Sequence, residues 1–457
     1  AGSAGFSAAI TAAEQGAQVA LVGHGTIGGT CVNIGCVPSK ALIRATEAVH
    51  HANTAGSRFA GVEGQARVAD WGALVAQKDA LVADLRQAKY ADLLPAYNNV
   101  AYHEGRARLA EGGVEAGGRR LASERIIIAT GTRPALPAIP GIADVSPLDS
   151  TTALALAELP RSIIVLGGGY IGAELAQTFA RAGVEVTLVF RSRLLPEAEP
   201  EIGAALAGYL AEEGIAVVGG LTYHSARRTE EGGVALTVVR GGRQEVIAAE
   251  RILAATGRAP NTEHLGLAEA GVARSSTGAI LVDDRMRTTR AGVYAAGDVT
   301  GRDQFVYMAA YGAKLAAKNA LNGDSLRYDN TAMPAVVFTD PQVASVGLTE
   351  ARARTAGHDA RTSVLTLDNV PRALAARDTR GLIKLVADGR TRRLLGAHIL
   401  APEGTDSIQT AAMAIRGGLT IDDLVETIFP YLTTVEGLKL AAQTFDQDVK
   451  KLSCCAG

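Results

Sequence analysis

Blocks of apolar residues alternate with glycine-rich turns along this chain, and they predict strands that are followed by helices. Near the start, a helix of small residues over 7–16 leads into the apolar strand VALVG at 19–23. The pattern returns in full at 161–191, as an apolar strand, three glycines, a helix and a second apolar strand. A further strand-rich section begins at 334. Strands that alternate with helices indicate parallel sheets covered by helices, so the pattern predicts an α/β fold.

The glycines between strand and helix have the spacing of a dinucleotide-binding turn. Gly167, Gly169 and Gly172 form the complete copy, and Gly2 and Gly5 stand where the second and third glycines of the first copy belong. Glycines at these places let the backbone approach a pyrophosphate and let the helix pack close to the sheet. Two copies predict two dinucleotide cofactors. The first glycine and first strand are expected to precede residue 1.

The residues after the second strand of each copy distinguish the cofactors. Arg191 and Arg193 follow the complete copy, where an acid would bind a free ribose hydroxyl. Arginines suit a 2′-phosphate, so NADPH is favoured over NADH, and solvated surface arginines are the alternative. In the first copy, Gly23 followed by His24 replaces the expected acid, which weakens the adenosine end of that site.

Composition narrows the class of protein. The chain has 457 residues, 47% of them hydrophobic, and a formal net charge of -2, which is typical of a soluble globular protein with about three domains. We expect no nucleic-acid surface, because no basic block occurs, and no membrane span, because no apolar run reaches about 18 residues. The 4 cysteines are too few for a disulfide scaffold, and no targeting signal can be read. A cytoplasmic protein is expected.

Two of the cysteines, Cys31 and Cys36, lie in GGTCVNIGCVPSK at 28–40. On a helix that begins near Thr30 their sulfurs would face neighbouring turns, and a helix N-terminus favours a reactive thiolate. A redox-active pair is therefore predicted. A zinc site is one alternative, although local CxxC or histidine partners are lacking, and a buried structural pair is another.

This segment closely resembles the redox-active segment of the pyridine nucleotide-disulfide oxidoreductases, a family of flavoenzymes. Other markers of the family are ATGTRP at 129–134, ATGRAPNT at 255–262 and YAAGDVT at 294–300, and the resemblance covers essentially the whole chain. It implies two Rossmann-like dinucleotide-binding domains plus an α+β C-terminal dimerisation domain. The expected limits are an FAD-binding domain at 1–150, an NADPH-binding domain at 151–270, a central segment at 271–330 that completes the FAD site, and an interface domain of a homodimer at 331–457.

The resemblance also implies roles for single residues. Cys36 is expected against the flavin and Cys31 toward the substrate, with Lys40 near the reactive flavin nitrogen and Glu174 as its carboxylate partner. Asp298 is expected at the ribityl chain. The remaining expected FAD-binding residues are Gly2, Gly5, Gly29, Thr30, Lys40, Thr130 and Gly131, and the expected NADPH-binding residues are Gly167, Gly169, Gly172, Arg191, Arg193 and Gly257.

The stretch IFPYLTTVEGLKL indicates the substrate class. In disulfide-reducing members a histidine here protonates the leaving thiolate, but this chain has Phe429, with Pro430 and Glu436 retained. A soft metal cation needs thiolates and no such acid, so Hg(II) is the predicted substrate. The remaining cysteines, Cys454 and Cys455, belong either to a frayed chain end without a function or to a loading arm that passes Hg(II) to Cys31 and Cys36.

The whole C-terminal stretch resembles the mercury-reducing branch of this family, in which the tail works at the partner subunit's active site. Tyr90 and Tyr431 resemble the two active-site tyrosines of that branch, and simple packing is the alternative for each. Two other functions use the same tail: a high-molecular-weight thioredoxin reductase-like disulfide reductase, and a non-catalytic metal-binding or metal-sensing protein. The missing histidine disfavours the former, and two nucleotide-binding units disfavour the latter.

Overall fold

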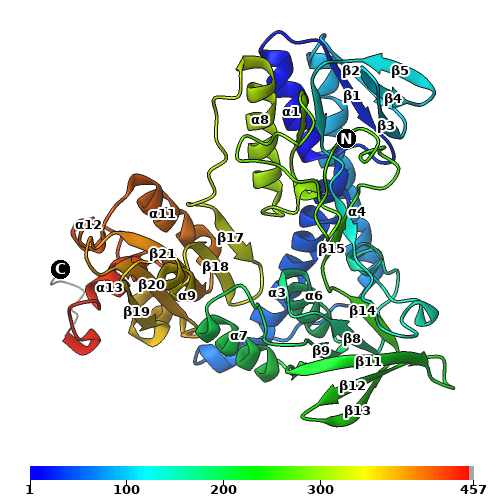
Figure 1. The fold of residues 1–457 in the computed structure, drawn as a ribbon. Helices are drawn as coiled ribbons and strands as arrows, with labels where there is room; N and C mark the ends of the chain where they lie inside the picture. Colours follow the sequence, from blue (N-terminus) through cyan, green and yellow to red (C-terminus); the bar gives the residue numbers. More distant parts are fainter. Residues whose placement is uncertain (452–457) are drawn as a thin grey trace.

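The computed structural model describes residues 1–451, arranged as two regions of helices and strands followed by a C-terminal region (Figure 1). In the first region, α1 (Ser3–Glu14) packs along α8 (Val306–Asn322), although some 300 residues separate them (Figure 1). The short strands pair as β1 (Val19–Gly23) with β2 (Val100–Glu104), and as β6 (Ile126–Ile128) with β16 (Val293–Ala295), both parallel. An antiparallel meander and two further elements complete it: β3 (Ala107–Ala110), β4 (Gly113–Ala116), β5 (Arg119–Ala122), α4 (Trp71–Arg86) and the π-helix Gln87–Ala91.

The predicted helix over both cysteines is broken in two. The short helix α2 (Gly29–Ile34) carries Cys31, and α3 (Cys36–Arg58) begins at Cys36 after the non-helical Gly35. A Cβ on Gly35 would lie 3.0 Å from the Thr30 carbonyl oxygen, so the chain turns tightly there. A single continuous helix was therefore the wrong expectation, because helical spacing alone does not register a turn of this kind.

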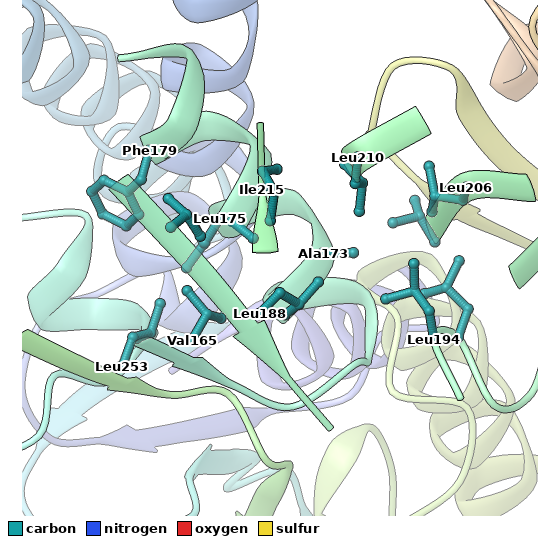
Figure 2. Packing of buried hydrophobic residues seen from close by; sticks show 14 of the residues in the cluster. Val165, Ala173, Leu175, Phe179, Leu188, Leu194, Leu206, Leu210, Ile215 and Leu253 are labelled. Atoms are coloured by element: carbon teal, nitrogen blue, oxygen red, sulfur yellow. The ribbon is translucent and has the colours of Figure 1, made fainter. Parts of the chain in front are cut away.

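The second region is a parallel sheet in the order β10-β9-β8-β14, covered by α6 (Tyr170–Arg181) and α7 (Pro200–Glu212). Its strands are β8 (Ser162–Leu166), β9 (Glu185–Val189), β10 (Ala216–Val218) and β14 (Arg251–Ala254). Val165 and Leu188 from the sheet meet Leu175 and Phe179 from α6 in a fully buried core (Figure 2). Continuous apolar runs such as SIIVL form these strands because parallel strands are covered on both faces.

Two smaller sheets lie beside these regions. The antiparallel sheet β11 (Leu221–Arg228), β12 (Val234–Arg240) and β13 (Arg243–Ala249) flanks the second region. Strand β7 (Thr132–Pro134) pairs with β15 (Arg258–Pro260), and α5 (Ser150–Ala153) lies at the crossing between the regions. The motifs ATGTRP and ATGRAPNT thus meet, although more than one hundred residues separate them in the chain.

The C-terminal region is a five-stranded antiparallel sheet in the order β17-β18-β21-β20-β19, with helices packed on it. The strands are β17 (Pro334–Val337), β18 (Gln342–Gly347), β19 (Ala360–Thr366), β20 (Leu382–Asp388) and β21 (Leu394–Ala401). The helices are α9 (Glu350–Thr355), α10 (Pro371–Ala376), α11 (Gly404–Gly417), α12 (Ile421–Glu426) and α13 (Glu436–Gln443). This arrangement agrees with the predicted fold class, while the domain limits themselves stay predictions.

Within residues 1–451, every helix is too short or too polar to cross a membrane.

Candidate redox site

A long cavity of about 2030 Å³ runs from the first glycine motif to the cysteine pair. All the residues expected to bind FAD line it: Gly2, Gly5, Gly29, Thr30, Lys40, Thr130, Gly131 and Asp298. Cys31, Cys36 and Glu174 also line it. The volume exceeds the roughly 300–1,000 Å³ of ordinary small-molecule sites, so it suits an extended dinucleotide such as FAD.

The two thiols interact with each other at one end of this cavity. Cys31 and Cys36 are free and half-buried. The hydrogen bond from the Cys31 thiol, assisted by the positive charge of Lys40, lowers the pKa of the Cys36 thiol to about 7. The same bond, together with burial, raises the pKa of Cys31 above its ordinary value. Cys36 is therefore the thiol that ionises first, which makes it the stronger candidate for electron exchange with a bound flavin.

Lys40 and Glu174 form an ion pair beside these thiols. Lys40 Nζ lies 2.7 Å from Glu174 Oε2 and 4.7 Å from the centroid of the Phe338 ring. The other carboxylate oxygen, Glu174 Oε1, accepts a hydrogen bond of 2.9 Å from the backbone N–H of Phe338. The Glu174 side chain is 7% exposed and the Lys40 side chain 30%. The carboxylate is therefore buried in the wall of the cavity, while the lysine stays partly accessible.

Asp298 closes another part of the wall. Its carboxylate accepts a hydrogen bond of 2.9 Å from the Thr132 hydroxyl, and the Arg258 guanidinium lies 4.0 Å away. Arg258 donates to the Thr132 hydroxyl and carbonyl, which ties the two arms of the β7–β15 pair together. Burial lowers the pKa of Arg258. Asp298 thus has one free face available for hydroxyl groups of a ligand.

The first glycine motif forms a crowded backbone crossing. Gly2 lies against Gly29, and a Cβ on Gly29 would come within 2.5 Å of the Gly2 Cα. Gly29 also has φ +68, which favours glycine. The N-terminus of the 12-residue helix α1 opens into the cavity next to this crossing. Bare backbone and a helix N-terminus together provide the donors that a pyrophosphate needs, so these residues fit FAD.

The complete glycine motif has the same design. A Cβ on Gly172 would lie 1.9 Å from the Gly167 carbonyl oxygen, whereas a Cβ on Gly169 would meet no atom within 4 Å. Gly172 therefore allows close packing of α6 on the sheet, and Gly169 leaves open space at the N-terminus of α6 for a phosphate. Gly257 adopts φ +125 and is equally open.

The two arginines expected at the 2′-phosphate differ in the structure. Arg191 is exposed. Arg193 folds back and donates to the carbonyls of Pro196 and Ala198, at 2.5 and 2.9 Å, and its buried Nη1 has no hydrogen-bond partner among residues 1–451. The sequence alone did not separate their roles, because nothing in it indicates that the chain after Arg193 turns back and presents the carbonyls of Pro196 and Ala198 to this side chain.

The two tyrosines lie outside the cavity lining. Tyr90 belongs to the π-helix, where its hydroxyl is 3.4 Å from that of Ser3 and its ring packs edge-on against Phe6. Tyr431 is 54% exposed in the loop before α13. Phe429 packs against the core of the C-terminal region, and Glu436 accepts a hydrogen bond from the backbone of Leu432. Cys454 and Cys455 lie outside the described residues.

Three residues that sequence reasoning did not single out complete this site. Arg258 lies within ATGRAPNT, Phe338 follows strand β17, and Tyr307 lines the cavity and stacks on Phe305 with their ring centroids 5.3 Å apart. Arg258 carried a signal, since it is the charged residue of ATGRAPNT. Phe338 carried none, because its role depends on a contact between distant parts of the chain.

Comparisons with known proteins agree with this geometry. The family model for pyridine nucleotide-disulphide oxidoreductases matches residues 1–317, and the model for their dimerisation domain matches residues 333–442. Two solved structures share the fold: the HOCl-induced flavoprotein disulfide reductase RclA from Escherichia coli (TM-score 0.83, 30% identity, 97% of this chain and 98% of the other), and LpdA from Mycobacterium tuberculosis (TM-score 0.85, 27% identity, 98% of each).

Curated relatives are more similar still. The mercuric reductase of Streptomyces lividans is 48% identical over 462 residues, which cover 100% of this chain and 97% of that protein. The mercuric reductase of Lysinibacillus sphaericus is 47% identical over 458 residues, covering 100% of this chain and 83% of the relative. This chain therefore belongs to the pyridine nucleotide-disulphide oxidoreductases and, within them, to the mercuric reductase family.

Proposed function

We propose that this protein uses NADPH to reduce Hg(II) thiolates to elemental mercury, with FAD and the Cys31–Cys36 pair between them. The observation that carries the proposal is the placement of both thiols beside the Lys40–Glu174 pair in a cavity shaped for a dinucleotide. In the overall reaction NADPH is oxidised to NADP⁺ with release of a proton, and Hg(II) takes up two electrons as Hg(0). When bound, FAD supplies a two-electron carrier between NADPH and the metal site.

The residues of this chain have separate tasks in the proposal. Cys31 and Cys36 bind the incoming Hg(II), since thiolates are the ligands that soft cations prefer. Lys40 and Glu174 would line the place where the nicotinamide and the flavin meet, and their opposite charges would set the electrostatic potential there. Asp298 orients the ribityl hydroxyls, and Arg191 selects the 2′-phosphate of NADPH. Tyr90 and Tyr431 are proposed to assist transfer of the metal, the latter from the partner subunit.

Hg(II) is favoured over a disulfide substrate because the acid needed for disulfide chemistry is missing. Breaking a disulfide releases a thiolate that must be protonated, and Phe429 occupies the place of the histidine that does this in disulfide-reducing relatives. Reduction of a thiolate-bound metal ion needs no such proton. We further propose a cytoplasmic homodimer in which Cys454 and Cys455 load Hg(II) into the partner's site.

The first experiment measures NADPH oxidation by the FAD-loaded protein with Hg(II) in excess small thiol, beside oxidised glutathione, lipoamide and thioredoxin. We expect mercury-dependent oxidation, release of volatile mercury and near silence on the disulfides. Turnover of thioredoxin with Hg(II) acting only as an inhibitor would contradict the proposal and assign the tail to electron transfer.

A pair of variants separates the two cysteine pairs. Cys36→Ala is expected to abolish Hg(II) reduction under all conditions. Cys454→Ala with Cys455→Ala is expected to impair turnover chiefly when the mercury is held by bulky or excess thiols. Equal losses in every assay would contradict the loading role of the tail.

A further inference from the structure

One face of α6 binds the C-terminal region next to the redox site. Glu174, Gln177 and Arg181 have the spacing i, i+3 and i+7, so they lie on the same side of the helix. All three contact the segment 338–340, which joins β17 to β18: Glu174 accepts from the Phe338 N–H, and Arg181 lies 2.9 Å from the Asp340 carboxylate. The helix that carries Glu174 is therefore attached to a segment more than 160 positions away in the sequence.

Gln177 makes the central contact of this face. Its Oε1 accepts from the Asp340 N–H at 2.8 Å, and its Nε2 donates to the Asp340 carbonyl at 2.8 Å and to Glu213 at 3.0 Å. The residue is 4% exposed. A buried carboxamide that uses both ends fixes the backbone N–H and carbonyl of Asp340. An apolar side chain in its place leaves the N–H without this acceptor and the carbonyl with only the longer bond of 3.4 Å from Arg181.

Phe338 links this contact to the ion pair. Its N–H donates to Glu174, its ring lies 4.7 Å from Lys40 Nζ, and it lines the cavity. One residue of the C-terminal region thus contacts both members of the pair. Its position depends on the path of the chain at 338–340, which Gln177 sets two residues further on.

We propose that Gln177 is a positioning residue of the redox site. By holding both the backbone N–H and the carbonyl of Asp340, it places Phe338 against Glu174 and Lys40 and keeps the lysine in one position in the cavity wall. The inference deepens the proposed function, since it concerns the same site.

The test measures how firmly Lys40 is held. Full-length, FAD-loaded protein is labelled competitively with acetic anhydride, and the modification of Lys40 is quantified by mass spectrometry. In Gln177→Leu, Lys40 is expected to react about threefold faster or more. The neutral amine is the form that attacks the anhydride, and it is more accessible once the side chain is released from its carboxylate and ring partners. Reduction of the flavin by NADPH in a single turnover is expected to slow by about tenfold, as the pair loses its alignment.

Asn319 provides a matched control. It lies on α8, is 2% exposed and likewise bonds both backbone groups of one residue. Its Nδ2 donates to the Leu326 carbonyl and its Oδ1 accepts from the Leu326 N–H, each at 2.9 Å. A third bond of 3.1 Å reaches the Arg285 carbonyl. Asn319→Leu should lose comparable thermal stability and leave Lys40 labelling unchanged. Equal labelling changes in both variants, or none in Gln177→Leu, would overturn the proposal.

A second variant keeps the test decisive if Gln177→Leu does not fold. Phe338→Leu retains the backbone N–H and removes the ring, so Lys40 is expected to react faster than in the parent protein. Unchanged labelling there also contradicts the proposal. Because the labelling contains no mercury, a protein that fails to reduce Hg(II) still reports whether Gln177 positions the site.

Discussion

Lys40 Nζ donates to Glu174 Oε2 over 2.7 Å, although 134 positions separate the two residues in the sequence. One lies on the helix that starts at Cys36, and the other lies on the first turns of α6, directly after the complete glycine motif. The pair therefore connects the first region to the second in the wall of the cavity that also holds both thiols.

Removing the charge of Glu174 is expected to slow turnover. Glu174→Gln loses a charge-assisted hydrogen bond of about 1.5–3 kcal/mol, which corresponds to a fall in kcat of roughly tenfold to a hundredfold. Steady-state kinetics with NADPH and Hg(II) measure it. Glu47→Gln is the control, because Glu47 pairs with Arg44 on the same helix α3, where the arginine is 58% exposed, and should change kcat by less than about twofold.

Gly29→Ala is expected to reduce the FAD content of the purified protein. The new Cβ would lie 2.5 Å from the Gly2 Cα and force the crossing apart. Gly25→Ala has nearly the same backbone angle, φ +73 against φ +68, but meets no atom within 4 Å. The control therefore carries only the strain of a left-handed alanine, about 1–2 kcal/mol. Equal FAD loss in both variants would show that close approach is unimportant.

Arg191 and Arg193 should differ as determinants of cofactor choice. Arg191→Ala is expected to raise the KM for NADPH by about tenfold and leave the KM for NADH unchanged, because only NADPH carries the 2′-phosphate. Arg193→Ala breaks hydrogen bonds to the carbonyls of Pro196 and Ala198, so it should lower the melting temperature of the protein, whereas Arg191→Ala should not. A parallel rise in both KM values for Arg191→Ala would contradict a phosphate contact.

Cys36 should react as a thiolate at neutral pH. Its pKa is lowered to about 7, first by the hydrogen bond from Cys31. Its alkylation by iodoacetamide in the reduced apoprotein should therefore reach half its maximal rate near pH 7. Cys31→Ala removes that bond, so the midpoint should move to higher pH. A midpoint that stays in place would show that other groups control the thiol.

His50 should make the protein less stable in mild acid. Burial, assisted by Arg181, lowers the pKa of His50 to about 4, and its Nε2 is buried without a hydrogen-bond partner. Between pH 6.5 and 4 the unfolded chain binds this proton and the folded chain does not, so stability falls as pH falls, by about 3 kcal/mol at most. Urea unfolding of His50→Leu should depend less steeply on pH in this range than unfolding of His224→Ala, which removes an exposed histidine.

The sequence predicted the features that are encoded locally. Apolar strands, glycine spacing and the cysteine pair each depend on a few neighbouring residues, and the α/β class follows from them. Several cavity-lining residues, such as Lys40, Thr130 and Asp298, were expected only from the resemblance to the family. The contacts between Gln177 and Asp340, and between Phe338 and Lys40, join distant segments, and nothing near these residues indicates their partners. The turn at Gly35 was missed although it is local, because the spacing of the two cysteines fits a single helix and does not reveal the tight packing of Gly35 against the Thr30 carbonyl.

Helix α3 has a consequence for how relatives of this protein can exchange parts. Its first turns carry Cys36 and Lys40, and its last turns carry His50, 3.8 Å from Glu213, and Arg58, 3.0 Å from Asp378. Glu213 belongs to the second region and Asp378 to the C-terminal region. A chimera that takes either region from another family member must also restore the acid that meets this helix, so the three regions are constrained to evolve together even though each has its own sheet.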